Sequence, residues 1–224
     1  MPLYVDRSDA GRHLVRQLLQ YAESPSAVVV ALPRGGVPVA AEVARALSLP
    51  LDILLVRKLG VPGHEELALG AIASGGAVIL NREIVDALGI GDAQIHLAAE
   101  RENKEMARRE RLYRGNIPRI PLTGRDVLLV DDGLATGATM RAAVRAIRHE
   151  APARIVVAVP VGAPDSCQIL SREADELICP ERPEPFNAVG VWYEEFGPTS
   201  DAEVIGCLRD ARSRAAGAPR APAP

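Results

Sequence analysis

Two adjacent carboxylates stand between an apolar run and a loop of small residues. The run is residues 127–130, the carboxylates are Asp131 and Asp132, and glycines and threonines follow as far as Thr139. Glycines let backbone N–H groups approach a phosphate closely, and threonine hydroxyls add donors. Because the carboxylates would repel that phosphate, we expect them to face sugar hydroxyls or a metal ion. The segment therefore predicts a site for a ligand with a phosphate beside vicinal hydroxyls.

An alternative is that Asp131 and Asp132 only cap the helix that follows them. Other phosphate motifs are excluded, because the sequence has neither Gly-Lys-Ser/Thr nor G-x-G-x-x-G. It also lacks a G-x-S-x-G elbow and a Cys–His signature, so we find no covalent nucleophile.

A second glycine-containing turn, Pro33-Arg34-Gly35-Gly36, follows the apolar run 27–32. The freedom of two glycines suits close approach of the backbone to a ligand, which favours anion binding by Arg34 over a plain surface role. Lys58 ends another apolar run and is either a second anion contact or part of a solvated strand end.

The elements around these turns alternate between strands and helices. This alternation predicts an α/β fold with a mostly parallel sheet, whose strands end at the edge where ligands bind. The strands are expected at 27–32, 52–58, 77–80, 125–132, 154–161 and 176–179, and the helices at 8–21, 37–48, 92–114, 140–150 and 164–173.

The segment VLLVDDGLATGAT resembles the signature of the type I phosphoribosyltransferases, in which apolar residues and an acidic pair precede a small-residue loop. With PRGG, VRKLG and FNAVGVWYEEF, the resemblance covers residues 27–205 and is strongest to stand-alone predicted phosphoribosyltransferases of unsettled acceptor. It implies a doubly wound parallel sheet with a small hood around 180–205. We expect one domain, residues 1–210, and a disordered Ala/Pro/Arg-rich tail, residues 211–224.

The resemblance also implies roles for the residues of both turns. Asp131 and Asp132 would bind the ribose 2- and 3-hydroxyls of phosphoribosyl pyrophosphate (PRPP). Arg34, Gly35 and Gly36 would form the pyrophosphate loop, which often carries a non-proline cis peptide, and Lys58 would contact the pyrophosphate. The phosphate loop would comprise Gly133, Ala135, Thr136, Gly137, Ala138 and Thr139.

The implied reaction is transfer of 5-phosphoribosyl from PRPP to a nitrogen nucleophile, as in nucleotide metabolism, with release of pyrophosphate. Mg²⁺ is the implied cofactor, held mainly by PRPP and in part by Asp131 and Asp132. Residues 60–76 correspond to a flexible lid. The alternative function is a PRPP- or nucleotide-binding regulatory protein of the same fold without transferase activity.

Four of the seven aromatic residues fall within the eleven positions 186–196. Phe186 and Phe196 are expected in a small core, whereas Trp192 and Tyr193 are candidates for stacking on a nucleobase-like acceptor. Relatives that use 6-oxopurines have an acidic residue where this chain has Ala135, which argues against hypoxanthine and guanine. The loop is closer to the adenine-type pattern, although the rest of the chain is not.

The whole chain has a formal net charge of −3, so no overall positive field attracts nucleic acid. The charged helix expected at 92–114 is either a solvated face or a homodimer contact, and RNA binding is the weakest alternative for it. Three cysteines without C-x-x-C spacing, and an N-terminus without an apolar segment, predict a cytoplasmic protein without a membrane span.

Overall fold

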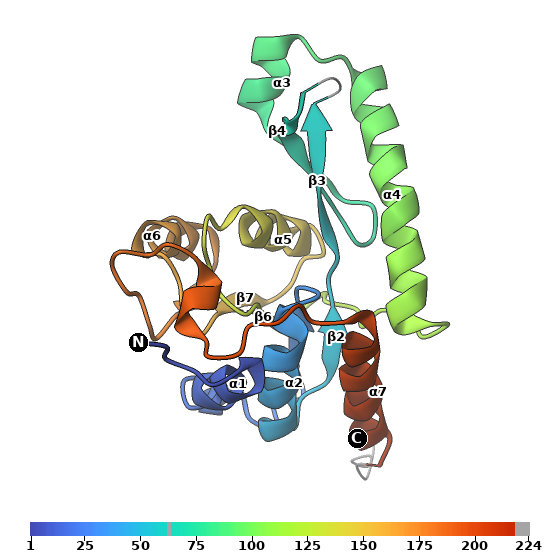
Figure 1. The fold of residues 1–224 in the computed structure, drawn as a ribbon. Coiled ribbons are helices and arrows are strands. Elements are labelled where there is room, and N and C mark those ends of the chain that lie inside the picture. Colours follow the sequence, from blue (N-terminus) through green and yellow to red (C-terminus); the bar gives the residue numbers. More distant parts are fainter. Residues whose placement is uncertain (62–63, 218–224) are drawn as a thin grey trace.

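The computed structural model describes residues 1–61 and 64–217, with side chains described outside 62–68 and 215–224. Its centre is a five-stranded sheet in which every neighbouring pair is parallel (Figure 1). β1 and β6 are neighbours in this sheet. From β1 the chain crosses over to β2 on one side, and from β6 it crosses over to β7 and β8 on the other side. The strands, in sheet order, are β2 (Leu51–Ile53), β1 (Ala27–Ala31), β6 (Asp126–Val130), β7 (Arg154–Ala158) and β8 (Glu176–Ile178).

Helices cover both faces of this sheet, which confirms the doubly wound α/β fold. Alternate β1 residues enter two cores: Val29 packs with one helical layer and Val28 with the other. Burial on both faces explains why these strands are continuous apolar runs in the sequence. The first layer contains α1 (Arg7–Val15), α2 (Gly36–Ala46) and α7 (Asp201–Gly217), and the second contains α5 (Ala138–Arg148) and α6 (Pro164–Glu173).

An arm that the sequence did not predict projects from the core (Figure 1). The strand expected at 52–58 is divided, because β2 joins the central sheet whereas β3 pairs antiparallel with β4. The expected lid, 60–76, is largely this hairpin, and residues 62–63 lie outside the described residues. The arm comprises β3 (Val56–Val61), β4 (His64–Ala73), β5 (Val78–Leu80), α3 (Arg82–Leu88) and α4 (Asp92–Arg114).

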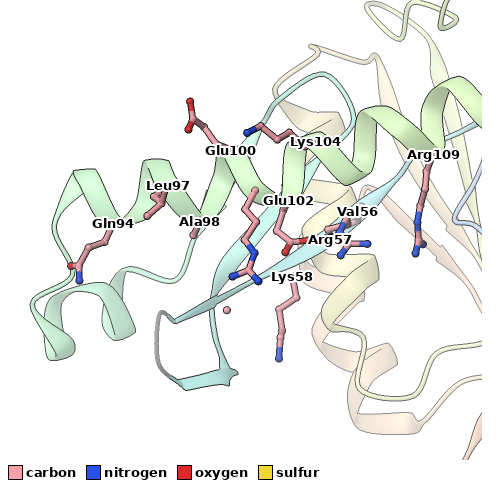
Figure 2. Close-up of a pocket in the computed structure, with 12 residues that line it drawn as sticks. Val56, Arg57, Lys58, Gln94, Leu97, Ala98, Glu100, Glu102, Lys104 and Arg109 are labelled. Atoms are coloured by element: carbon pink, nitrogen blue, oxygen red, sulfur yellow. Dashed lines mark hydrogen bonds and ion pairs between the residues drawn. The ribbon is translucent and has the colours of Figure 1, made fainter.

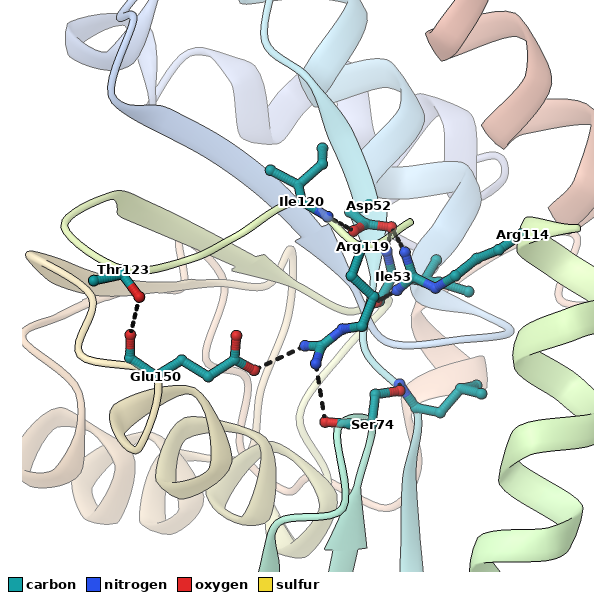
Figure 3. A network of polar contacts seen from close by, with 9 residues as sticks. Asp52, Ile53, Ser74, Arg114, Arg119, Ile120, Thr123 and Glu150 are labelled. Carbon is teal, nitrogen blue, oxygen red and sulfur yellow. Dashed lines mark hydrogen bonds and ion pairs between the residues drawn. The ribbon is translucent and has the colours of Figure 1, made fainter. Parts of the chain in front are cut away.

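A buried ion pair joins the end of α4 to the central sheet (Figure 3). Arg114 and Asp52 are each 5% exposed, and Arg114 donates to the Asp52 carboxylate and to the Ile53 carbonyl. Asp52 also accepts from the N–H groups of Ile53 (2.9 Å) and Ile120 (2.8 Å). The buried charge of Asp52 is thus compensated by one guanidinium group and two backbone N–H donors, as burial of a charge requires.

A second set of contacts ties the base of the hairpin to the turn after α5 and to the core. Arg119 donates to the Ser74 carbonyl (3.2 Å) and to the Glu150 carboxylate (2.8 Å), as Figure 3 shows. The Ser74 hydroxyl in turn accepts from the N–H of Leu55 (3.0 Å). These contacts fix the arm at the point where it leaves the sheet.

The C-terminal region differs from the expectation of a disordered tail. α7 runs to Gly217, so residues 211–217 are helical, and Ala211 is buried in the core. Residues 218–224 lie outside the described residues. Before α7, the hood segment includes the 3-10 helix η2 (Val189–Trp192). Within the described part of the chain, no helix is both long and apolar enough to cross a bilayer.

Candidate active site

The two predicted turns meet where β1 and β6 lie side by side. Ala31 pairs with Val130, so Pro33–Gly36 and Asp131–Thr139 leave the same edge of the sheet. A Cβ atom on Gly36 would lie 2.8 Å from Asp131 Cα, which shows how closely the two backbones approach. The peptide bond between Pro33 and Arg34 is cis, as the resemblance implied. This crevice is the expected ligand position in an open parallel sheet.

The paired carboxylates lie at the base of the crevice. Asp131 Oδ1 accepts from the Asp132 N–H at 2.9 Å, and Asp132 Oδ2 accepts from Arg7 Nε at 2.8 Å. Burial raises the pKa of Asp131 well above its ordinary value, and the nearby Asp132 charge raises it further. Burial also raises the pKa of Asp132, with Arg7 opposing the shift. The carboxyl oxygens of the pair are able to accept hydrogen bonds from sugar hydroxyls.

Tyr193 lies beneath this pair rather than facing an acceptor. Its hydroxyl donates to the Asp132 carbonyl at 2.5 Å, and its ring packs on Tyr4 and Phe196 at centroid distances of 5.5 and 5.0 Å. Burial raises the pKa of Tyr193. Because Tyr193 is only 4% exposed, its ring is not open to stack on a base, which corrects that expectation.

Trp192 is partly exposed and packs near Phe186, with ring centroids 6.1 Å apart. The Trp192 carbonyl accepts from the N–H groups of Leu3 (2.8 Å) and Tyr4 (3.1 Å), which joins the N-terminus to the hood. Phe186 and Phe196 pack around a buried cluster that includes Tyr4, as expected. Stacking of Trp192 on an acceptor stays a prediction.

The loop after the carboxylates is held firmly at its base. The Leu134 N–H donates to the Val161 carbonyl (2.9 Å), and the Leu134 carbonyl accepts from Ala163 (2.7 Å). The Ser166 hydroxyl donates to the Ala135 carbonyl at 2.5 Å. On the other side, a Cβ on Gly133 would lie 2.5 Å from Val189 Cγ1, so the hood packs directly on this glycine.

The tip of the same loop is open to solvent and ends in a helix N-terminus. Gly137 caps α5 with φ +73°, a conformation that favours glycine. The first backbone bond into the helix runs from Arg141 N–H to the Gly137 carbonyl at 2.9 Å. The N–H groups of the first helical turn have no helix carbonyl to bind, and N–H groups so placed are able to bind an anion. The exposed residues are Ala135, Thr136, Ala138 and Thr139.

The two predicted cations approach the site from different sides. Arg34 is exposed beside the cis peptide, and its Nη1 lies 3.7 Å from Asp201 Oδ1. Asp201 also accepts from the Tyr113 hydroxyl (2.6 Å), and burial raises the pKa of Tyr113 to about 12. Arg34 therefore lies near the start of α7.

Lys58 lines a hollow of about 660 Å³ between the arm and α5, together with Ala138 and Thr139 of the phosphate loop. It also borders a second hollow of about 810 Å³ between β3 and α4 (Figure 2). There, Arg57 Nε and Glu102 Oε2 pair at 2.5 Å. The arm thus brings Lys58 to the phosphate loop, although not through the strand end that the sequence predicted.

Magnesium would find oxygen ligands in this crevice but no complete cage. No cluster of three or more His, Cys, Asp or Glu side chains that could hold a metal occurs among the described residues. Mg²⁺ usually binds one or two carboxylates together with substrate phosphates. Asp131 and the Asp132 oxygen that Arg7 leaves available fit that partial role.

A family comparison agrees with this geometry. The model of the phosphoribosyl transferase domain matches residues 6–194, which include both turns and the first part of the hood. The chain belongs to the phosphoribosyltransferase family. Membership explains why an acidic pair and a phosphate loop occupy the crevice between β1 and β6.

Similar proteins are found among both sequences and structures. Two Mycobacterium tuberculosis proteins, each named "Putative phosphoribosyl transferase" (Rv0571c in strain H37Rv and MT0597 in strain CDC 1551), are 45% identical over 208 residues. Those residues are 93% of this chain and 47% of each relative, so the chain spans about half their length. The crystal structure of TT1426 from Thermus thermophilus is 41% identical, with a TM-score of 0.82, covering 94% of this chain and 99% of that chain.

Several residues of this phosphoribosyltransferase-family site were not predicted from the sequence. Arg7 lies 125 positions before its partner Asp132, and Asp201 lies far from Arg34 along the chain. Val189 and Ser166 support the phosphate loop from the hood and from α6. None of these four has a local motif, so only the three-dimensional arrangement identifies them.

Proposed function

We propose that this protein transfers the 5-phosphoribosyl group of PRPP to a nitrogen nucleophile and releases pyrophosphate. The observation that carries the proposal is the arrangement in one crevice of an acidic pair, an open helix N-terminus and an arginine turn. These groups match the ribose, the 5-phosphate and the pyrophosphate of PRPP in turn. Family membership supports the same chemistry.

Substrate binding would begin with the two ends of PRPP. The 5-phosphate would accept from the N–H groups and hydroxyls of residues 135–139, where the helix dipole favours an anion. The ribose 2- and 3-hydroxyls would donate to Asp131 and Asp132. The contact between Gly133 and Val189 would keep the hood against the bound sugar.

Bond cleavage at the anomeric carbon would create negative charge on the pyrophosphate and positive charge on the ribose. Arg34 and Lys58 would stabilise the departing anion, and Mg²⁺, when bound to the phosphates, would neutralise part of its charge. Asp131 and Asp132 would place negative potential beside the developing cation. Preorganised charges of this kind contribute about 10²- to 10³-fold each in comparable sites.

The acceptor we propose is a planar, nucleobase-like nitrogen compound. Trp192 supports this, because it is partly exposed on the hood that packs on the phosphate loop. Ala135 is exposed and has no side chain with which to bind the polar edge of a 6-oxopurine. We therefore place hypoxanthine and guanine behind other bases in a substrate panel.

The experiment is an assay of pyrophosphate release from PRPP and Mg²⁺ with purines, pyrimidines, nicotinate-like acids and simple amines. Asp132→Asn should lower kcat/KM by about 10²-fold or more. Asp126→Asn is the matched control, because Asp126 begins β6 at the end of the strand that is remote from Asp132. There its carboxylate accepts a hydrogen bond from the Ser26 hydroxyl (3.3 Å). No release with any acceptor while PRPP still binds would favour the regulatory alternative.

A further inference from the structure

The arm carries a hollow of its own, about 810 Å³ in volume, between β3 and α4 (Figure 2). The described residues that line this arm hollow all belong to those two elements, so none comes from the sheet edge where β1 and β6 meet. Five of them are lysine or arginine and two are glutamate. The volume lies in the range of small-molecule sites, so the positive charge surrounds a space that a small anion could fill.

The arm hollow is built by packing between the helix and the strand. Leu97, Arg101 and Lys104 are four and three positions apart, so they share one face of α4. The helix packs along β3, and Arg57 of the strand pairs with Glu102 of the helix at 2.5 Å. This ion pair joins the two walls of the hollow.

Two of the five cations have carboxylate partners on α4. Arg57 pairs with Glu102, and Arg109 Nε lies 2.9 Å from Glu105 Oε1. The Arg57 and Glu102 side chains are 29% and 25% exposed, so their pair forms a partly buried side of the hollow. These partners neutralise two charges and hold the guanidinium groups in place.

The other three cations, Lys58, Arg101 and Lys104, are exposed. The second glutamate of the described lining, Glu100, is 57% exposed, and its Oε1 lies 3.4 Å from His96 Nε2. Long, flexible cationic side chains can turn toward a ligand beside them. The described lining of the arm hollow therefore carries an excess of positive charge on side chains that water reaches.

The chemistry of this lining fits phosphate groups. A guanidinium group binds a phosphate through two parallel N–H donors, and a lysine adds a point charge. No aromatic side chain occurs among the described lining residues, so this part of the hollow offers a base no ring on which to stack. Beyond the hollow, Arg108 of α4 pairs with Glu105 at 2.7 Å, so the basic surface does not continue along the helix. A compact anion fits this confined charge better than a nucleic acid strand.

We propose that the arm hollow is a second anion site, which binds a compact oligophosphate. Arg101 and Lys104 would bind its phosphates, with Arg57 and Arg109 at the sides. Lys58 lines both this hollow and the one beside the phosphate loop, so the two sites share one side chain. An oligophosphate on the arm would therefore compete with PRPP for Lys58, a consequence that rests on the proposed transferase function.

The test is a calorimetric titration of inorganic tripolyphosphate, without Mg²⁺, into the wild type, Arg101→Gln/Lys104→Gln and Arg108→Gln/Arg111→Gln. Arg108 and Arg111 form the matched control, because they are exposed on the same helix and do not line the hollow. We expect Arg101→Gln/Lys104→Gln to bind at least about 10-fold more weakly, because it loses two charge-assisted contacts. The control should stay within about twofold of the wild type, because it changes only distant, screened charge.

The crevice could also bind tripolyphosphate, so each titration is repeated with Arg34→Gln added. Binding that Arg34→Gln abolishes and Arg101→Gln/Lys104→Gln leaves unchanged would overturn the proposal. Equal weakening in Arg101→Gln/Lys104→Gln and in the control, or no binding by the wild type, would overturn it as well. Tripolyphosphate binding that depends on Arg101 and Lys104 in a protein that releases no pyrophosphate would support the arm site while refuting the proposed transfer.

Two further ligands identify the source of the phosphates. Adenosine triphosphate should bind about as tightly as tripolyphosphate, whereas binding of the nucleotide alone would overturn recognition through phosphates. A 12-nucleotide single-stranded RNA that bound more than about 10-fold tighter, and lost this affinity in Arg101→Gln/Lys104→Gln, would replace the proposal with a nucleic-acid surface. In the pyrophosphate-release assay, tripolyphosphate should raise KM for PRPP less in Arg101→Gln/Lys104→Gln than in the control. An equal rise would overturn the coupling through Lys58.

Discussion

Gly35 of the pyrophosphate loop and Asp132 of the acidic pair are in direct contact. A Cβ on Gly35 would overlap Asp132 Oδ2 and lie 2.8 Å from Asp132 Cγ. Arg7 Nε would be 3.3 Å from the same Cβ, so the glycine completes the packing around the carboxylate. The requirement for glycine here is therefore steric and follows from the position of a functional side chain, because Gly35 itself has an ordinary helical φ of −59°.

Replacing Gly35 with alanine should displace the Asp132 carboxylate and break its bond to Arg7. We expect Gly35→Ala to lower kcat/KM for PRPP by about 10²-fold, comparable to the loss of one preorganised charge. Gly206→Ala in α7 is the control, because a Cβ there meets no atom within 4 Å. Steady-state kinetics with both variants would test this, and full activity in Gly35→Ala would show that Asp132 need not stay in place.

Asp131 should cost the protein stability at neutral pH. Its folded pKa lies above the unfolded value of about 3.9, so the folded state binds the proton more tightly and stability falls as pH rises through the folded pKa. Asp131→Asn removes this cost and can still accept from the Asp132 N–H. We expect it to raise the free energy of unfolding by about 1 kcal/mol at pH 8, within the range usual for stabilising substitutions.

The gain in Asp131→Asn should shrink toward pH 4, where the carboxyl is protonated in the folded state and increasingly so in the unfolded state. Urea unfolding at pH 4.5, 6 and 8 would measure this. A variant less stable than the wild type at pH 8 would mean that the ionised Asp131 stabilises the fold.

Arg34 should matter for catalysis and little for folding. Its side chain is 47% exposed and lies 3.7 Å from Asp201, which makes a weak surface pair. We expect Arg34→Gln to reduce kcat/KM for PRPP by about 10²-fold and to change the free energy of unfolding by less than about 0.5 kcal/mol. Arg45→Gln, on the same helical layer and 52% exposed, should change neither quantity. Equal kinetics in the two variants would remove Arg34 from the pyrophosphate site.

Arg114 should matter for folding. Removing it leaves Asp52 buried without its ionic partner, which typically costs about 3–5 kcal/mol. We expect Arg114→Met to lose that much in urea unfolding, whereas Arg108→Met, 63% exposed on the same helix, should lose almost nothing. The double variant Asp52→Asn/Arg114→Met should lose less than the two single variants together, because the residues interact directly. Additive losses would show that the pair is not coupled.

The crevice could be predicted from the sequence because its parts are local. Apolar runs buried on both faces mark β1 and β6, and each is followed at once by its functional turn. The family resemblance added the cis peptide at Pro33–Arg34 and the fold. The positions of Asp131, Asp132 and the phosphate loop follow from the parallel pairing of these two strands.

The arm and the charge partners could not be predicted in the same way. The apolar run 52–58 gives no sign that β2 and β3 belong to different sheets, because the two residues between these strands, Leu54 and Leu55, are as apolar and as buried as the strands' own core residues. Pairs such as Arg7 with Asp132 depend on packing between distant elements. Tyr193 resembled a stacking residue, but it is buried and its hydroxyl donates to the Asp132 carbonyl.

The first part of the expected tail, residues 211–217, is helical rather than disordered, because its composition is compatible with both states. Proline is frequent in disordered segments, whereas alanine and arginine are strong helix formers. Here Leu208 and Ala211 pack in the core, and this packing extends α7 to Gly217.

The most direct test of the PRPP site is a calorimetric titration of PRPP, with Mg²⁺, into the wild type, Asp132→Asn and Asp126→Asn. We predict that the wild type and Asp126→Asn bind PRPP equally, that Asp132→Asn binds it at least about 10-fold more weakly, and that all three remain folded. A tenfold change in Kd corresponds to about 1.4 kcal/mol of binding free energy. This is a modest contribution for a hydrogen bond between a ribose hydroxyl and a buried carboxylate. Equal binding by Asp132→Asn, or no binding by the wild type, would contradict the assignment of this crevice as the PRPP site.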